Sequence, residues 1–295
     1  MASPSTRLGQ RFLILLPFAW LTAFFLVPFV LVLAISLSEV RVGMPPYAPI
    51  FDWDGLVFSA KLNFENFMFV LGDGIYLRAY LNSLKVSAIA TAMTFLVAYP
   101  LAYGISRCSE RWRSILVFLV IVPFWSSLLI RVYSWMAILR NDGLLNATLL
   151  HLGLIDQPLQ IMNTETAIYI GVVYTYLPFM VLPIYSSLAG ADRTLVEAAQ
   201  DLGCSRLSAF WKVTFPLSAP GIAAGVALVF IPVVGEFVIP DLLGGADSQM
   251  IGRTIWIEFF NNRDWPVASA VTVLLLIILV APIILVQSRL SRARV

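Results

Sequence analysis

Six long apolar stretches alternate with polar gaps along this chain of 295 residues. Each stretch is close to the roughly 20 apolar residues that an α-helix needs to cross a bilayer. The stretches are continuous, whereas the strands of a membrane barrel alternate between apolar and polar residues with a period of two. The pattern predicts an all-α integral membrane protein with six spans, near residues 12–37, 80–105, 114–138, 165–190, 217–239 and 266–288.

Composition supports this class, because 60% of the residues are hydrophobic and only 12% are charged, against about a quarter charged in soluble domains. The first stretch follows Arg7 and Arg11, as in a signal peptide, but it is longer than the roughly 7–15 residues of a signal core. We therefore interpret it as an uncleaved first span. No internal repeat or second domain is visible, so a single membrane domain is expected over residues 1–295.

The basic residues predict that both termini are cytoplasmic. Eleven Lys and Arg residues lie at the termini and in the gaps on the same side, against six in the gaps on the other side, and positive charge favours the cytoplasmic side. Twelve carboxylates lie on the opposite, external side, counting Glu165 at the outer edge of the fourth stretch, and four lie in the cytoplasmic gaps. An acidic outer face would attract a cationic solute. Cys108 and Cys204 fall on the cytoplasmic side, where a disulfide is not expected.

Three external segments, 38–79, 139–164 and 240–265, are long enough to hold structure of their own. The first contains three prolines between Met44 and Pro49, which predict a stiff extended piece. The third contains an aromatic run from Ile255 to Phe260, which predicts a short helix at the bilayer surface. Both segments are candidate docking surfaces, or else simple connections between spans.

The chain offers little enzyme chemistry. His151 is the only histidine, which excludes a histidine-based metal cluster or triad within the membrane. The phosphate-cradling Gly-x-x-x-x-Gly-Lys-Ser/Thr sequence of an ATPase is missing, and no run of carboxylates lies in mid-span as a proton pump often requires. No catalytic residue, metal site or bound cofactor is predicted. If transport is driven, ATP and Mg would be bound by another chain.

The polar gap at 191–216 predicts a helix, a turn and a second helix. Thr194 and Glu197 have the spacing of a capping box, and Gly203 stands where a helix would end in a left-handed residue. Ser205 can cap a second short helix through about Lys212. Pro216, which lacks an amide hydrogen, suits the first turn of the next span.

The same gap resembles the EAA loop of ATP-binding-cassette importer permeases. That loop has Glu-Ala-Ala, three residues, Gly, nine residues and Ile-x-Leu-Pro; here Glu197-Ala198-Ala199, Gly203 and Val213-x-Phe215-Pro216 have this spacing. Val and Phe stand where the pattern has Ile and Leu, both apolar exchanges. Further stretches resemble polyamine importer permeases, most closely the PotH-type putrescine subunit: 129–135, 178–185, 235–240 and 259–266.

The resemblance implies a type I importer in the bacterial inner membrane. This permease would form half of the path and pair with a second, homologous permease, two copies of a cytoplasmic ATPase and a periplasmic polyamine-binding protein, with no nucleic acid involved. The loop would be the coupling helix seated in a groove of the ATPase. The residues implied in coupling are Glu197, Ala198, Ala199, Gly203, Leu207, Phe210, Trp211 and Pro216. A helix lying on the membrane surface is the alternative for this loop.

Apart from Glu165, the first residue of the fourth stretch, Glu236 is the only carboxylate that this topology places within a span, close to the outer interface. Pro232 and Gly235 predict a kink beside it. A polyamine path should offer carboxylates and aromatic faces, so the candidates are Glu236, Asp241, Tyr133, Trp135, Tyr174 and Tyr176. Ordinary packing and interfacial anchoring remain alternatives for the aromatic residues. We interpret Arg131 as structural, with Glu236 as its possible partner.

Two other functional classes stay open. A permease of the same superfamily for thiamine, ferric ion or an oxyanion would keep the loop but lack the acidic outer face. A stand-alone channel or secondary transporter would need no ATPase and therefore no ordered docking loop.

Overall fold

The computed structural model describes residues 4–54, 57–192, 194–245 and 248–292. Arg193, Asp247 and Arg294, which contributed to the charge comparison, lie outside these ranges. The described chain divides into two compact units, one up to Arg78 together with the part from Thr254 onward, and one from Ala79 to Arg253. The prediction of a single permease domain stays a prediction.

Among the described residues, the regular secondary structure is helical apart from one small hairpin. Its helices, including short 3-10 and π segments labelled η, are α1 (Pro4–Leu21), η1 (Thr22–Leu26), α2 (Val27–Ser36), α3 (Glu65–Gly72), α4 (Gly74–Arg107), α5 (Glu110–Ile121), η2 (Val122–Trp125), α6 (Leu128–Leu139), α7 (Leu144–His151), α8 (Glu165–Gly190), α9 (Thr194–Asp201), α10 (Arg206–Ala209), η3 (Phe210–Thr214), α11 (Phe215–Val234), α12 (Val238–Leu243), α13 (Ile251–Trp256), η4 (Ile257–Asn261) and α14 (Trp265–Arg292). Strands β1 (Phe51–Asp54) and β2 (Val57–Ala60) pair antiparallel, with Phe51 opposite Ala60. The hairpin departs from the all-α prediction.

Within the described residues, four helical stretches are long and apolar enough to cross a membrane: Leu13–Ser36, Gly74–Arg107, Glu165–Gly190 and Arg206–Val234. They match the predicted first, second, fourth and fifth spans. The helices at Glu110–Trp125 and Leu128–His151 would add a fifth span if they are counted as one, but they meet at an angle of 91°. The shorter apolar stretch Trp265–Ala281 falls at the predicted sixth span. The count of six therefore stays a prediction.

The prediction of one continuous helix over 114–138, the third span, is wrong. Its helix breaks after Trp125, because Ser126 is extended and its hydroxyl donates to the Pro123 carbonyl at 2.8 Å. A new helix, α6, begins after Ser127, which is also extended. Tyr133 and Trp135 are thereby carried on a helix bent sharply away from α5.

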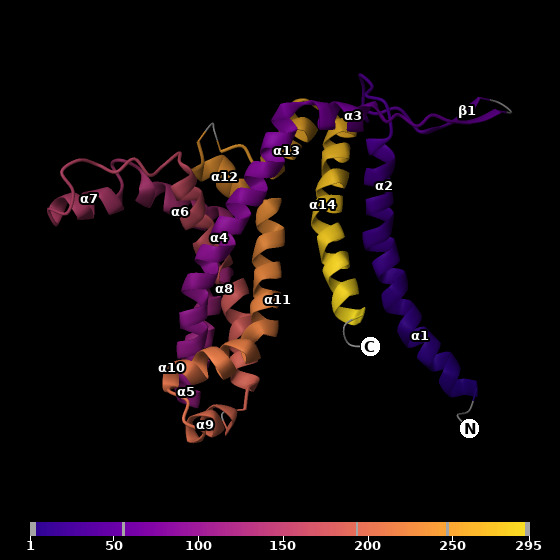
Figure 1. Ribbon diagram of the computed structural model, residues 1–295. Helices are drawn as coiled ribbons and strands as arrows, with labels where there is room; N and C mark the ends of the chain where they lie inside the picture. The colour runs from indigo at the N-terminus through magenta and orange to yellow at the C-terminus, as the bar shows by residue number, and fades with distance from the viewer. Residues whose placement is uncertain (1–3, 55–56, 193, 246–247, 293–295) are drawn as a thin grey trace. The chain divides into compact units, whose positions relative to one another are not determined.

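In the first unit, α2 packs against α14, and Figure 1 shows the two lying side by side. Ala268, Ser269 and Ala270 are buried small residues on α14, which permit a close approach. The Nδ2 group of Asn66 donates to the carbonyls of Ser36 and Ser38 at 3.0 and 2.8 Å. This buried amide satisfies carbonyls that the end of α2 leaves unpaired.

The Met44 to Pro49 segment also belongs to this unit, and it folds back against residues 39–41 after a series of bends. Val40 pairs with Tyr47 across an isolated bridge, and the Arg41 amide donates to the Pro46 carbonyl at 3.2 Å. The prediction of a stiff extended piece is therefore wrong. The predicted aromatic helix at 255–260 is confirmed by α13 and η4.

In the second unit, α8 and α11 pack along their lengths, as Figure 1 also shows. Gly221 and Gly225, one turn apart on α11, make this possible. A Cβ at Gly221 would collide with the Pro183 carbonyl of α8, and a Cβ at Gly225 would stand 2.7 Å from the Met180 sulfur. The Tyr99 hydroxyl of α4 lies 3.1 Å from the Ser218 hydroxyl of α11, and this hydrogen bond joins α4 to α11.

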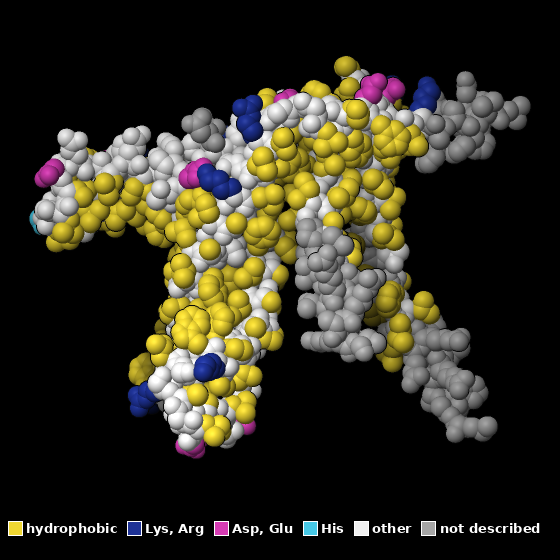
Figure 2. Space-filling model, viewed as in Figure 1, with side chains coloured by type: hydrophobic (Ala, Val, Ile, Leu, Met, Phe, Trp, Pro, Cys, Tyr) yellow, Lys and Arg dark blue, Asp and Glu magenta, His cyan; other side chains and the backbone are white. Residues whose placement is uncertain are grey.

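Hydrophobic side chains cover the shaft of this second unit, and its charged side chains gather toward the two ends (Figure 2). Leu96, Leu101, Leu119 and Leu228 are examples of large apolar side chains that remain exposed. An apolar shaft with charged ends is what a helix bundle in a bilayer should present, because lipid replaces water around its middle.

Candidate coupling loop and translocation path

The helix α9 begins at Thr194, as the sequence predicts. Asp192 supplies its cap in place of Thr194: the Thr194 amide donates to Asp192 Oδ1 at 2.9 Å. This hydrogen bond holds the pKa of Asp192 below its usual range, so the carboxylate is charged at neutral pH. A negative charge also suits the positive end of the helix. Glu197 and Ala198 are exposed on α9, and Ala199 is half-buried.

Gly203 ends α9 in the left-handed conformation, with a φ of +86°, as predicted. Its amide donates to the Gln200 carbonyl at 2.9 Å, and the Cys204 amide donates to the Ala199 carbonyl at 3.0 Å. These two bonds form a Schellman motif. No atom lies within 4 Å of the place where a Cβ would stand. The backbone conformation alone, and not lack of space, calls for glycine here.

Ser205 caps the second helix as predicted, its Oγ accepting from the Ser208 amide at 3.2 Å. The helix does not stop near Lys212, however. It continues from Arg206 through the π turn η3 into α11, and together they form one apolar stretch up to Val234. Pro216 falls within the first turn of α11. Because proline has no amide to donate and crowds the preceding turn, the wider π turn accommodates it without breaking the helix. The loop is thus continuous with a candidate span.

The loop exposes large apolar side chains on α9, α10, η3 and the turn between them. The exposed fractions are 48% for Leu195, 87% for Leu202, 69% for Leu207 and 57% for Trp211. Isolated exposed apolar residues are ordinary, but a group of them on a surface marks a site of interaction. Arg206, also exposed, lies beside Leu207.

Phe210, predicted as a docking residue together with Trp211, instead faces inward. Its ring meets the rings of Tyr99 and Tyr103 edge-on at 5.9 and 5.4 Å. The Phe210 ring therefore anchors the loop to α4. Leu202 was missed as a candidate because it stands in the turn, although its exposure is the largest of the group.

At the other end of α11, Glu236 lies in a break between helices and not within a span. The helix α11 ends at Val234, and Gly235 forms its C-cap, so Pro232 and Gly235 mark a helix end where a kink was predicted. The next helix, α12, begins at Val238. The Val238 amide donates to Glu236 Oε1 at 3.0 Å. Glu236 therefore takes part in starting α12.

Tyr176 and Glu236, two of the candidate path residues, meet directly. The Tyr176 hydroxyl donates to Glu236 Oε2 at 2.6 Å. Tyr176 is 9% exposed, whereas Glu236 is half-buried. Gly252 packs so closely on the backbone of Gly235 and Glu236 that a Cβ there would stand 2.8 Å from the Glu236 carbonyl oxygen. The carboxylate is thus held in place by both a side chain and the backbone around it.

The other candidate path residues form no hydrogen bond or ion pair with Glu236 in the described structure and lie in different parts of the second unit. Trp135 and Tyr174 meet edge-on, with ring centroids 5.5 Å apart. Tyr133 is 56% exposed. Asp241 forms an ion pair with Arg253, whose Nε lies 2.9 Å from Asp241 Oδ1. In the described part of the chain, Tyr176 is the candidate aromatic residue that forms a hydrogen bond with Glu236.

Arg131 does not pair with Glu236 within the described part of the chain. Its guanidinium carbon lies 5.6 Å from the centre of the Phe124 ring, and its Nε and one terminal nitrogen are buried without a hydrogen-bond partner. Phe124 meets Phe179 edge-on at 5.0 Å, and Phe179 lies 5.9 Å from Tyr176. Sequence reasoning missed both phenylalanines, because nothing in their spacing sets them apart from core residues.

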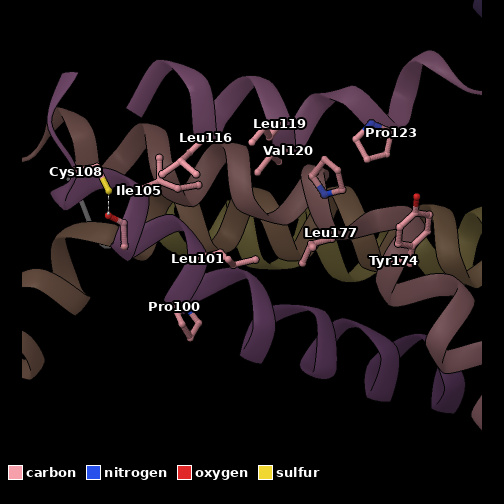
Figure 3. A pocket seen from close by; sticks show the side chains of 12 residues that line it. Pro100, Leu101, Ile105, Cys108, Leu116, Leu119, Val120, Pro123, Tyr174 and Leu177 are labelled. Carbon is pink, nitrogen blue, oxygen red and sulfur yellow. Dashed lines mark hydrogen bonds between the residues drawn. The ribbon is translucent and has the colours of Figure 1, made fainter. Parts of the chain in front are cut away.

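An apolar cavity of about 630 Å³ lies between α4, α5, η2 and α8. Figure 3 shows its lining, with Leu101, Leu116 and Leu177 around it and Tyr174 at one side. None of the described residues that line it is charged. We assign it no part in binding a cation, since a charged group entering it would lose its hydration without a partner.

Comparison with known proteins identifies the family. The model for binding-protein-dependent transport system inner membrane components matches residues 8–292. The chain belongs to this family. It is therefore a membrane component of a binding-protein-dependent transport system, and its homologues are permease subunits, which do not themselves catalyse a reaction.

Several relatives are similar over most of the chain. The spermidine/putrescine transport system permease protein PotB of Haemophilus influenzae is 40% identical over 264 residues, which cover 90% of this chain and 88% of the relative. PotB of Escherichia coli K12 is 44% identical over 220 residues, covering 75% and 80%. The E. coli inner membrane ABC transporter permease protein YdcU is 31% identical over 211 residues, covering 68% and 67%. The likeness is to PotB; the PotH-type resemblance stays a prediction.

Solved structures agree in fold. A chain of a bacterial ABC transporter involved in the import of the acidic polysaccharide alginate superposes with a TM-score of 0.71 at 18% identity, covering 98% of this chain and 96% of that one. The same transporter with an alginate pentasaccharide-bound periplasmic protein gives 0.71 at 17% identity. At this identity the likeness establishes an all-helical ABC permease fold and nothing about the solute.

Proposed function

We propose that this chain is a permease subunit of an ATP-driven importer of polyamines, spermidine or putrescine, in the inner membrane of a bacterium. It would cross the membrane six times with both termini in the cytoplasm. A second permease, two copies of an ATPase that bind ATP and Mg, and a periplasmic polyamine-binding protein would complete the importer. The PotB relatives, named for spermidine and putrescine transport, support the choice of solute.

The observation that carries the coupling role is the exposed helix pair α9 and α10, of which α10 continues without interruption into α11. Leu202, Leu207 and Trp211 project from it as exposed apolar side chains. Such side chains are suitable anchors for a groove on another protein, and large anchors dominate the binding energy of an interface. Because α10 is continuous with α11, movement of the docked loop would be transmitted to the membrane helix as a rigid-body displacement.

The geometry around Glu236 supports a cationic solute. A carboxylate at the break between α11 and α12 would attract an ammonium group by about 1–4 kcal/mol at 4 Å, depending on how far water is excluded. Tyr176, Phe179 and Phe124 form a connected row of rings from Glu236 to Arg131. Their faces offer cation–π contact to the ammonium groups and apolar contact to the methylene chain between them. Arg131 would repel a cation at the far end of this row.

The test is uptake into vesicles that contain the complete importer. Labelled spermidine should enter with ATP and receptor present, unlabelled putrescine and spermidine should compete, and thiamine should not. Competition by thiamine alone, or transport of neither polyamine by an assembled complex, would contradict the proposed solute.

A further inference from the structure

Lys85 on α4 and Glu165 at the start of α8 form an ion pair that the proposed path does not use. Lys85 Nζ lies 2.9 and 3.0 Å from the two carboxylate oxygens of Glu165. The Tyr169 hydroxyl, one turn along α8, donates to Glu165 Oε2 at 3.2 Å. A primary ammonium group is thus held by both oxygens of a carboxylate that a phenol also contacts.

The same chemistry occurs again on α8. Tyr176 donates to Glu236 as Tyr169 donates to Glu165. The two tyrosines are seven residues apart, which places them on the same side of the helix, roughly 10 Å from each other along its axis. Among the residues that the structure describes, the carboxylate of Glu236 has a tyrosine and backbone amides for partners but no cation. The carboxylate of Glu165 has a cation supplied by the chain itself.

The Lys85–Glu165 pair is open to exchange. The Lys85 and Glu165 side chains are 54% and 37% exposed. Exposed ion pairs contribute only about 0–1 kcal/mol to stability, so this one is a weak reason for the two helices to stay together. A second ammonium group that reached Glu165 could replace Lys85 without a large loss of folding free energy.

We propose that Glu165 and Tyr169 form a second binding station for an ammonium group of the solute, and that Lys85 occupies this station when no solute is present. The proposal rests on the proposed function, because a ligand that replaces the lysine on Glu165 must be cationic, as a polyamine is. The ligand is a primary ammonium group at the end of an alkyl chain. Lys85 keeps the station charge-neutral while it is empty and competes with the arriving solute.

The test is equilibrium binding of labelled spermidine to the purified importer without receptor or ATP. Lys85→Met keeps the length of the side chain but removes the competing charge. If the pair is worth up to about 1 kcal/mol, its removal should tighten binding by up to about fivefold, because the station is then always available. Glu165→Gln should weaken binding, and Lys85→Met combined with Glu165→Gln should show no gain over Glu165→Gln alone.

Arg140→Gln is the matched control. It breaks another exposed ion pair, that of Arg140 and Asp142 at 3.1 Å, and should leave spermidine binding unchanged. A purely structural Lys85 would give no tightening in Lys85→Met, and this result would overturn the proposal, as would tightening that persists with Gln at position 165. Co-purification of the other subunits confirms that each variant is assembled. If wild-type vesicles transport spermidine but Lys85→Met binds it as the wild type does, only this inference fails.

Discussion

Replacing Gly203 tests whether the turn between α9 and α10 transmits the movements that accompany ATP hydrolysis in a partner ATPase to the membrane helices. At a φ of +86°, a residue with a Cβ costs about 1–2 kcal/mol. The surrounding space adds nothing to this cost, because no atom lies within 4 Å of the Cβ position. A loss of 1–2 kcal/mol reduces the population of the native turn by roughly 5–30-fold relative to its alternatives.

Gly203→Val should therefore reduce ATP-dependent spermidine uptake in vesicles by up to about this factor, while the protein still reaches the membrane. Gly203→Asn should keep most of the activity, because asparagine tolerates the left-handed region. Both variants should be compared at equal amounts of inserted permease.

The chain contains a matched control in Gly153, which follows α7. Gly153 has a φ of +66° and nothing within 4 Å of its Cβ position. Its amide donates to the Leu150 carbonyl at 3.1 Å, and the Leu154 amide donates to the Leu149 carbonyl at 3.0 Å, the same motif as at Gly203. Gly153→Val therefore has a similar backbone cost outside the loop and should leave uptake nearly normal. Normal uptake in Gly203→Val, or an equal loss in Gly153→Val, would refute the assigned role.

Two further substitutions separate docking from substrate passage. Trp211→Ala should lower co-purification of the ATPase, since an exposed anchor of this kind is worth about 2 kcal/mol or more once buried in a partner; full retention of the ATPase would contradict the docking surface. Phe210→Ala should instead lower the thermal stability of the permease, because it removes the contacts with Tyr99 and Tyr103. Glu236→Gln keeps an acceptor for Tyr176 but removes the charge, so uptake should fall about tenfold for a loss of 1.4 kcal/mol with the ATPase still bound, and unchanged uptake would leave Glu236 a helix cap only.

The sequence predicted much of the conformation of the loop at 191–216, because its determinants are local; the coupling role stays a prediction. Gly203 and Ser205 fix the turn through their own backbone and side-chain preferences, and both behave as predicted. Asp192 was passed over as the cap because the Thr194 and Glu197 spacing offered a competing pattern. Phe210 could not be placed, since its direction depends on Tyr99 and Tyr103, more than 100 residues away in the sequence.

The bend in the third apolar stretch shows what hydropathy cannot reveal. The residues on both sides of Ser126 are mostly apolar, so a hydropathy average over a window shows one span where the chain turns by 91°. Pro123 followed by Ser126 and Ser127 was the available indication, because a serine hydroxyl that binds a nearby carbonyl competes with the helix.

Glu236 was misplaced for a related reason. Counting along a continuous apolar stretch puts it in a helix, although Gly235 ends α11 one residue earlier. Its partner Tyr176 belongs to another helix, and the pairing depends on how α8 and α11 pack. Lys85 and Glu165 were missed as a pair because their contact likewise joins two different helices.

The central claim is that ATP hydrolysis on a partner chain drives polyamine passage through this permease. The most direct measurement records spermidine uptake and ATP hydrolysis together in vesicles that contain the permease pair and polyamine-loaded receptor, with the ATPase present or left out. We predict uptake that accompanies hydrolysis and disappears when the ATPase is omitted. Spermidine uptake that continues without the ATPase would contradict the claim and identify a stand-alone channel or secondary transporter.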